Sequence, residues 1–152
     1  MDLILWRHAE AEDGTPDLAR PLTAKGHKQA RRMADWLASQ LPEGCKILVS
    51  PALRTLQTIE PLGRKFKVVN ALAPEATPAA VLQAANWPNS KEPVLVVGHQ
   101  NTLGQVAALL LCGQPQSWEV KKNSVWWIVQ REPKDADSIY LKAVMTSDLI
   151  VK

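Results

Sequence analysis

Cysteine, histidine and long apolar runs are all scarce in this chain of 152 residues. The two cysteines, Cys45 and Cys112, are too few and too isolated for a disulfide framework, so we expect reduced thiols in a cytoplasmic protein. No apolar run approaches the length of about 20 residues that crosses a bilayer, so no membrane-spanning helix is expected. The apolar stretch 3–5 runs at once into Arg7, which is not the form of a signal peptide.

Charge of either sign is also modest. The formal net charge is +3 and no block of lysine or arginine stands out, so neither nucleic acid nor a membrane is expected as a partner. Apolar residues make up 46% of the chain and charged residues 22%, as in ordinary globular proteins. With no repeat or linker in the sequence, residues 1–152 are expected to form a single domain.

Several catalytic motifs are missing. A zinc site needs about three protein ligands at close spacing, but the chain has only three histidines and neither an HxxH nor a CxxC pair. Arg7 would also repel a cation bound at His8. No Gly-x-Ser-x-Gly motif occurs, and neither cysteine lies in a basic anion-binding loop. We therefore expect no metal and no cofactor.

Apolar and β-branched segments predict the strands of a sheet. These segments are 3–6, 46–49, 67–69, 93–97, 124–130 and 138–145. Helical spacing of apolar residues predicts four helices. Thr23 and Thr77 are expected to cap two of them, and the others run from 50 to about 63 and from 102 to 112, where Gly113 ends the last one. Ser50 is expected to cap the second helix, with Pro51 at its first position. The alternation of strands and helices along the chain predicts an α/β fold: a mostly parallel central sheet flanked by helices, with an antiparallel hairpin at one edge.

Charged and imidazole side chains follow three of these strands. Arg7 and His8 follow the first strand, Arg54 lies where the second turns into a helix, and His99 follows the strand 93–97. Ligands of open α/β sheets bind outside the carboxyl ends of the strands, so these four side chains are expected to meet. Arginine offers a planar fork to phosphate oxygens, and a neutral imidazole can attack phosphorus. The pattern predicts a phosphoryl site in which a neutral imidazole is the nucleophile.

The same residues carry a resemblance to a known family. Residues 3–9 resemble the Arg-His-Gly signature of the histidine phosphatase superfamily, and 96–99 its second histidine motif. Residues 17–26 are similar to the D-x-x-R-P-L-T-x-x-G segment of its short SixA-like phosphohistidine phosphatases. Residues 50–58 and 72–78 match S-P-x-x-R-x-x-Q-T and L-x-P-x-x-T-P. The resemblance implies a phosphoglycerate mutase-like fold and metal-independent catalysis.

It also implies a role for each matched position. His8 would be phosphorylated, and Arg7, Arg54 and His99 would surround the phosphoryl group. Arg20 and Gln100 are expected as further contacts to phosphate or substrate. The chain departs from the family at two places: position 9 is alanine where glycine is usual, and Gln100-Asn101 replaces Asn-Pro, where Asn101 is expected to cap the following helix.

A general acid is harder to assign. Glu75 is the nearest candidate by its order in the family pattern, and a solvated loop residue is the alternative interpretation. Glu10, Glu12 and Asp13 are close to His8 in sequence and stay as further candidates. A weak or missing acid suits a leaving group that departs easily, such as an imidazole leaving from a P–N bond.

The leading functional hypothesis is therefore a phosphatase acting on phosphohistidine in a protein, such as a histidine phosphotransfer domain. Two alternatives remain. One is a phosphatase or mutase for a small phosphoester, which the short chain disfavours because it has no insertion to form a lid. The other is a catalytically inactive phosphate-binding interaction module, which would not need both His8 and His99.

Overall fold

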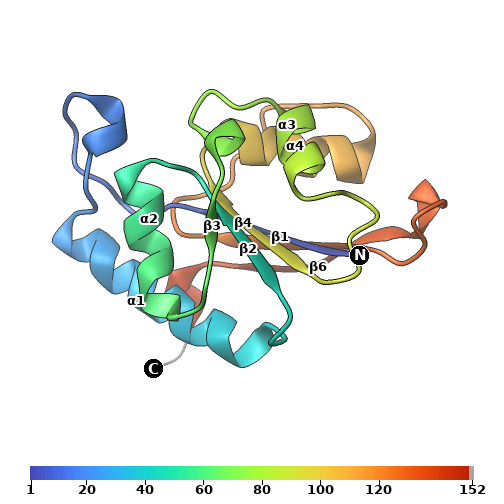
Figure 1. The fold of residues 1–152 in the computed structure, drawn as a ribbon, viewed down its shortest axis with the longest axis horizontal. Helices are drawn as coiled ribbons and strands as arrows, with labels where there is room; N and C mark the ends of the chain where they lie inside the picture. Colours follow the sequence, from blue (N-terminus) through green and yellow to red (C-terminus); the bar gives the residue numbers. More distant parts are fainter. Residues whose placement is uncertain (151–152) are drawn as a thin grey trace.

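A computed structural model describes residues 1–150, in which six strands form one sheet (Figure 1). The strands are β1 (Asp2–Arg7), β2 (Lys46–Val49), β3 (Lys67–Val68), β4 (Val94–Gly98), β5 (Val125–Gln130) and β6 (Ile139–Met145). Their order across the sheet is β3-β2-β4-β1-β5-β6. The first four in this order are parallel, whereas β5 runs antiparallel to both β1 and β6. The predicted parallel sheet with an antiparallel edge hairpin is confirmed.

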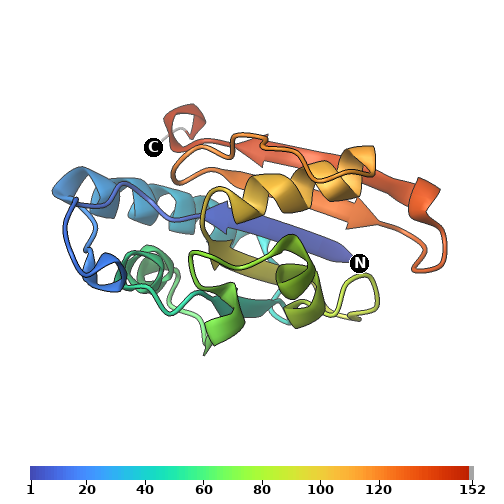
Figure 2. The same ribbon diagram turned by 90° about the horizontal axis from the view of Figure 1, so that it is seen from above.

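Helices cover both faces of the sheet, as the view from above shows (Figure 2). They are α1 (Ala24–Gln40), α2 (Leu53–Ile59), α3 (Pro78–Ala84) and α4 (Thr102–Cys112). Short 3-10 turns are η1 (Asp17–Ala19), η2 (Glu60–Leu62), η3 (Asn70–Leu72), η4 (Ala136–Ser138) and η5 (Ser147–Leu149). No helix within residues 1–150 combines the length and the apolar character needed to cross a bilayer.

Strand β1 explains why two helical layers form. Ile4 and Trp6 pack into the cluster that contains α1 and α2 residues, and Leu3 and Leu5 pack into the cluster under α3 and α4. All four side chains are fully buried, which stabilises the fold by about 1.5–3 kcal/mol for each large apolar group. A strand that is apolar on both faces must lie inside a sheet covered on both sides. The chain that follows it, from Arg7 onward, is therefore held in a rigid place.

The helix caps predicted at Thr23 and Thr77 are confirmed, whereas the one predicted at Ser50 is wrong. The hydroxyl oxygens of Thr23 and Thr77 accept hydrogen bonds from the amides of Gly26 and Ala80, at 2.9 and 3.2 Å. Ser50 does not cap α2 and Pro51 is not its first residue, because the helix begins at Leu53 and its N-cap residue is Ala52. The extended residues between β2 and α2 leave the Ser50 hydroxyl free for another partner.

Candidate active site

The carboxyl ends of β1 and β4 place two histidines side by side. These strands are parallel neighbours with Arg7 opposite Gly98, and the amide of His8 donates to the carbonyl of Gly98 at 3.1 Å. The His8 and His99 ring centroids lie 5.3 Å apart. Both side chains are almost buried, at 7% and 3% exposure. Residues 91 positions apart in sequence thus meet because the topology brings both strand ends to one edge.

The ring of His8 is oriented by its own loop. Its Nδ1 lies 2.7 Å from the carbonyl oxygen of Ala9, and because a carbonyl only accepts, Nδ1 carries the proton. The Nε2 lone pair is then left available. Burial, together with the positive charges of Arg54, Arg7 and Arg20, lowers the pKa of His8 to about 4, against the opposing effect of the Ala9 hydrogen bond. The imidazole is therefore neutral, and nucleophilic, at neutral pH.

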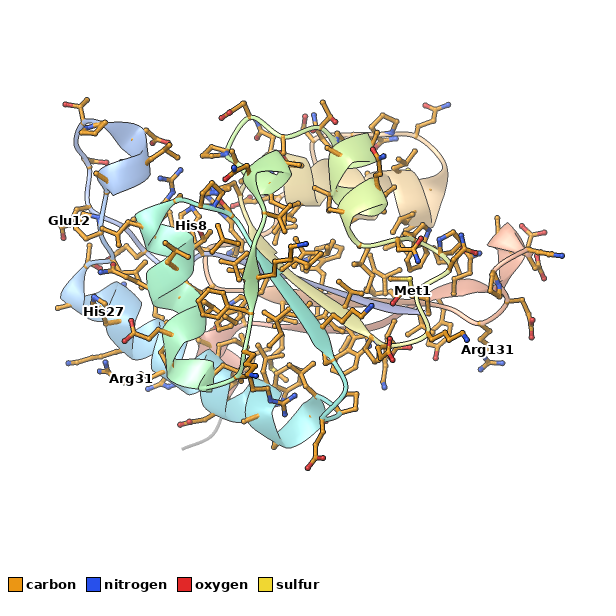
Figure 3. The ribbon with its side chains drawn as sticks, viewed as in Figure 1. Met1, His8, Glu12, His27, Arg31 and Arg131 are labelled. Carbon is orange, nitrogen blue, oxygen red and sulfur yellow. The ribbon has the colours of Figure 1, made fainter. Side chains whose placement is uncertain are left out.

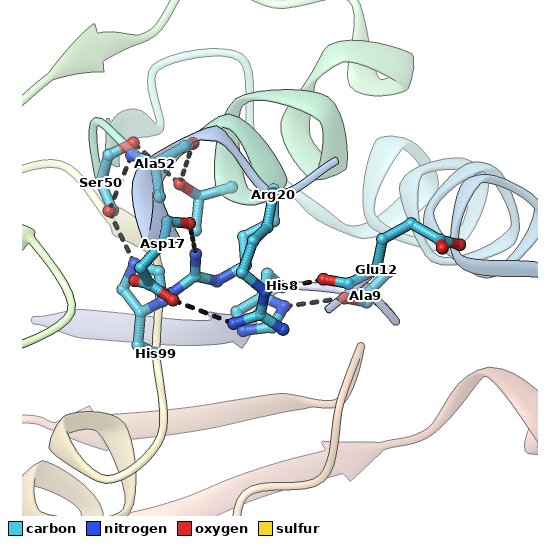
Figure 4. A network of polar contacts seen from close by, with 10 residues as sticks. His8, Ala9, Glu12, Asp17, Arg20, Ser50, Ala52 and His99 are labelled. Carbon is cyan, nitrogen blue, oxygen red and sulfur yellow. Dashed lines mark hydrogen bonds and ion pairs between the residues drawn. The ribbon is translucent and has the colours of Figure 1, made fainter. Parts of the chain in front are cut away.

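The ring of His99 is oriented by Ser50, the residue that does not cap α2. Ser50 Oγ lies 2.7 Å from His99 Nε2 and also accepts the amide of Ala52 at 3.3 Å (Figure 4). We assign the hydroxyl proton to the bond with Nε2, so His99 carries its own proton on Nδ1. Burial lowers the pKa of His99 to about 3, helped by the neighbouring His8 and Arg54. His99 is thus a neutral hydrogen-bond donor.

Arg54 and Arg20 share one carboxylate, that of Asp17 in η1. Nη2 of Arg54 lies 3.1 Å from Asp17 Oδ2, and Nη1 of Arg20 lies 3.0 Å from Oδ1 (Figure 4). Arg54 also donates to the backbone carbonyl of Asp17 at 2.8 Å. The hydrogen bond from Arg20, and then that from Arg54, holds the pKa of the Asp17 carboxyl below its usual value. Asp17 was not predicted as a site residue, although it opens the D-x-x-R-P-L-T segment.

Arg7 is held by the segment before β5. Its Nη1 donates to the carbonyl of Val120 at 2.9 Å. Gln100 fixes the same segment, because its Nε2 donates to the Trp118 carbonyl at 2.8 Å and its Oε1 accepts the Val120 amide at 3.1 Å. Both ends of the Gln100 amide therefore bind backbone, which makes Gln100 a support for Arg7 in this structure.

Asn123 is a second supporting residue that the sequence pattern did not indicate. It is fully buried, with a φ of 61°. Its amide donates to the carbonyls of both Arg7 and His8, at 3.1 and 3.0 Å. Its side chain accepts from the indole of Trp6 at 3.1 Å and donates to the carbonyl of Gln29 at 2.9 Å. These bonds fix the backbone that carries Arg7 and His8.

Three buried nitrogens in the site have no partner. Among the buried side-chain nitrogen and oxygen atoms of residues 1–150, those without a hydrogen bond are Arg7 Nε, Arg54 Nε and His99 Nδ1. All three are N–H donors, given the tautomer assigned to His99. Leaving a buried donor unpaired costs about 1–3 kcal/mol, so three in one place indicate a site built to receive an anion.

The predicted carboxylates lie outside this cluster. Thr23 donates to Glu10 Oε2 at 2.8 Å, so Glu10 serves the start of α1. The side chains of Glu12 and Asp13 are exposed, and Arg20 binds only the backbone carbonyl of Glu12, at 2.7 Å. Glu75 is exposed in the loop before α3; its neighbour Ala76 accepts a hydrogen bond from Thr102 at 2.7 Å. No carboxylate within residues 1–150 is hydrogen-bonded to either histidine ring.

The two departures from the family pattern have different outcomes. Ala9 is fully buried against Leu22 and Ala30, and its φ is not positive, so a methyl group is accommodated beside His8. Asn101 occupies the N-cap position of α4, but its side chain makes no capping hydrogen bond. The expectation that Asn101 caps the helix is wrong, because its backbone is already helical there.

Within the described chain, no group of three or more His, Cys, Asp or Glu side chains is arranged to hold a metal ion.

Comparison with known proteins relates this chain to the histidine phosphatases. The model of the histidine phosphatase superfamily (branch 1) matches residues 3–78. Phosphohistidine phosphatase SixA of Escherichia coli K12 is 36% identical over 124 residues, which are 75% of this chain and 76% of the relative. A SixA homologue of Haemophilus influenzae is 29% identical over 72% of this chain and 77% of the relative. The solved structure of the protein histidine phosphatase SixA complexed with tungstate matches with a TM-score of 0.77 and 27% identity, over 97% of this chain and 98% of that one.

Proposed function

Because the chain belongs to the histidine phosphatase superfamily (branch 1), we propose that it is a phosphohistidine phosphatase whose nucleophile is His8. We propose further that residues 1–152 form one catalytic domain and that the substrate is a protein carrying phosphohistidine. The observation that carries the mechanism is the set of three unpaired donors, Arg7 Nε, Arg54 Nε and His99 Nδ1, around the oriented ring of His8.

Binding of the phosphoryl group uses these donors. Each N–H takes one phosphoryl oxygen, and the two guanidinium groups add positive charge where the transition state concentrates negative charge. Arg20 joins them on the phosphate side when Asp17 releases it. Gln100 acts through Val120, whose carbonyl keeps the Arg7 guanidinium in place. The tungstate in the SixA structure is a tetrahedral oxyanion, which agrees with such a site.

The first chemical step transfers the phosphoryl group to His8. Nε2 forms a bond to phosphorus while the bond from phosphorus to the substrate's imidazole nitrogen breaks. The substrate ring carries a proton on its other nitrogen, so the electron pair stays on the leaving nitrogen and the ring departs as neutral imidazole. The Nδ1–H bond to the Ala9 carbonyl, 2.7 Å long, stabilises the positive charge that develops on the His8 ring.

The second step returns the enzyme to its starting state. The oxygen of a water molecule forms a bond to phosphorus while the bond to Nε2 breaks, and the electron pair returns to His8. The water protons leave with inorganic phosphate or pass to solvent. His8 is again neutral, because its pKa of about 4 favours the unprotonated ring.

The lack of a carboxylate at the histidine rings supports the choice of substrate. An alkoxide leaving from a phosphoester needs a proton from a general acid, whereas a phosphohistidine ring protonated on its other nitrogen leaves as neutral imidazole, whose conjugate acid has a pKa of about 6.5, without one. Glu75 is exposed, with no hydrogen bond from its side chain to the site, so the proposed mechanism does not use it. A P–N bond therefore suits this site better than a P–O bond.

Turnover of a histidine-phosphorylated phosphotransfer protein, measured beside a panel of sugar phosphates and phosphoserine, tests this proposal. We expect kcat/KM for the phosphohistidine protein to exceed that for each phosphoester by about a hundredfold or more, the scale of a missing general acid. Comparable or faster hydrolysis of a small phosphoester would favour the alternative phosphatase. Phosphate binding without turnover of any substrate would favour the inactive module.

A further inference from the structure

A group of cations lies beside the active site and takes no part in the chemistry. A hollow of about 300 Å³ on the flank of α1 is lined by Lys25, Lys28, Gln29, Arg32, Ser147 and Asp148. The hydrogen bond with Thr146 chiefly lowers the pKa of the Asp148 carboxyl, and the charge of Lys121 lowers it a little more, which places Lys121 near the hollow. We call Lys25, Lys28, Arg32 and Lys121 the basic shelf.

The topology places the basic shelf at the same edge of the sheet as His8. Helix α1 starts at the carboxyl edge of the parallel strands, so Lys25 and Lys28 lie in its first turns there. Lys121 precedes β5, which runs antiparallel to β1 and therefore begins at that edge. Strand β6 ends there too, just before Ser147.

A short path of contacts joins the shelf to the nucleophile. The His8 carbonyl accepts the Asn123 amide at 3.0 Å, and the Asn123 side chain donates to the carbonyl of Gln29 at 2.9 Å. Gln29 itself lines the hollow. Two residues, Asn123 and Gln29, therefore connect the shelf to His8.

The charges of the shelf are largely uncompensated. The described chain has three ion pairs, Arg20–Asp17, Lys46–Glu92 and Arg54–Asp17, and none involves a shelf residue. Asp148 is the one acidic residue that lines the hollow, against three basic ones. Two carboxylates near His8 in sequence lie elsewhere: Glu10 accepts from Thr23 at the start of α1, and Asp17 is paired with Arg20 and Arg54. The hollow between α1 and η5 is therefore a basic surface, with three cations against one carboxylate.

We propose that the basic shelf is a docking surface for an acidic face of the protein that carries the phosphohistidine. This inference rests on the proposed function, since a protein substrate must cover the surface around His8. Complementary charge at the rim of an interface raises the association rate and fixes orientation more than it adds contact energy. The shelf thus discriminates between phosphoproteins by the charge next to their phosphohistidine, and does not affect a small substrate that reaches only the arginines.

A charge-reversal experiment with a matched control tests the docking surface. The shelf variant is Lys25→Glu/Lys28→Glu, whose new carboxylates lie near the N-terminus of α1, where negative charge favours the helix. The control is Lys91→Glu/Lys134→Glu, which makes the same change of charge at the opposite edge, before β4 and after β5. In Figure 3, Arg131 of that same turn after β5 lies at the far end of the molecule from His8. Each enzyme is assayed with a phosphotransfer domain of net negative charge phosphorylated on histidine, and with phosphoramidate.

We expect the shelf variant to raise KM for the phosphoprotein by about tenfold at low salt, with kcat and the kinetics on phosphoramidate unchanged. The difference from wild type should shrink as salt is added, because screening acts on exposed charges. The control should match wild type on both substrates. An equal loss on both substrates, an equal effect of the control, or no effect of the shelf variant would overturn the docking surface alone.

Two other outcomes can be distinguished from failure of the docking surface alone: failure of the proposed function, and binding of the shelf to lipid. If wild type hydrolyses neither phosphohistidine protein nor phosphoramidate, the proposed function fails and the docking surface fails with it. Sedimentation with vesicles that contain phosphatidylglycerol measures the competing role of a membrane surface. Retention of wild type and control, but not of the shelf variant, would assign the shelf to lipid and overturn the proposal; no retention of any of the three is the result that we expect.

Discussion

Replacing Asp17 by asparagine is expected to tighten the binding of phosphate-like anions. The Asp17 carboxylate lies between Arg54 and Arg20, 3.1 and 3.0 Å from their nitrogens, so it occupies donors that a phosphoryl group would use. An anion that enters the site must displace this carboxylate or tolerate its charge. Asparagine keeps the size of the side chain and removes the charge, so the cost of displacement falls.

The size of this change in affinity follows from the exposure of the three side chains in the two ion pairs. The Asp17 side chain is 54% exposed, whereas those of Arg54 and Arg20 are 5% and 24% exposed, so water screens both interactions. Exposed ion pairs contribute about 0.2–1 kcal/mol each, which gives about 0.4–2 kcal/mol for the two together. Since about 1.4 kcal/mol corresponds to a tenfold change in affinity, the inhibition constant should fall by about twofold to thirtyfold.

Competitive inhibition by orthovanadate measures this effect directly. Asp13→Asn is the control, because Asp13 is an exposed carboxylate of the same loop and forms none of the described ion pairs. We expect a lower inhibition constant for the Asp17 variant and a nearly unchanged one for the control. A higher inhibition constant for Asp17→Asn would refute the reasoning, since it would mean that the carboxylate holds the two arginines in place for the anion.

Four further predictions concern the histidines and the role of metals. With phosphoramidate, kcat/KM should show no acid limb near pH 6.5, because pKa values of about 4 and about 3 keep His8 and His99 neutral; a limb at about 6.5 would contradict the burial argument. The unfolded chain protonates these rings below about pH 6.5 and the folded one only below about 4, so Tm should decline as pH falls through that window. Ser50→Ala should slow turnover by about tenfold or more and move the His99 proton toward Nε2 in ¹⁵N spectra, with Ser50→Thr restoring both; an unchanged tautomer would reject the assignment. Chelation with EDTA should leave turnover unchanged, and restoration of a lost rate by zinc or magnesium would argue against a metal-independent site.

The positions of the histidines were predictable from the sequence because they depend on simple patterns. Arg7 and His8 follow a strand whose four residues 3–6 are all apolar, and His99 follows another such strand, so both had to lie at the end of a buried parallel pair. Thr23 and Thr77 were predictable as caps because their hydrogen bonds are local. The fold and the proximity of the two histidines therefore follow from the apolar pattern of the strands and from the position of each histidine directly after a strand.

The supporting contacts were not predictable, because they depend on distant partners. Ser50 has the local pattern of a helix cap, but its hydroxyl binds His99, 49 residues away. The local sequence around Asn123 indicates only a polar loop residue. In the structure, however, it binds Trp6, 117 residues away, and the carbonyls of Arg7 and His8. Asp17 was part of a recognised segment, but only the structure brings it to Arg54. Each of these contacts is decided by the packing of loops that have no periodic signal.

The central claim is that the phosphoryl group passes through His8. Rapid quenching of the enzyme during turnover of a ³²P-labelled phosphohistidine protein, followed by peptide mapping under alkaline conditions, locates an acid-labile phosphate. We expect the label on His8 in the wild-type enzyme, and neither label nor turnover in His8→Ala, whose Arg7 and Arg54 should still bind phosphate. Label on any other residue, or a His8→Ala variant that turns over at the wild-type rate, would contradict the mechanism.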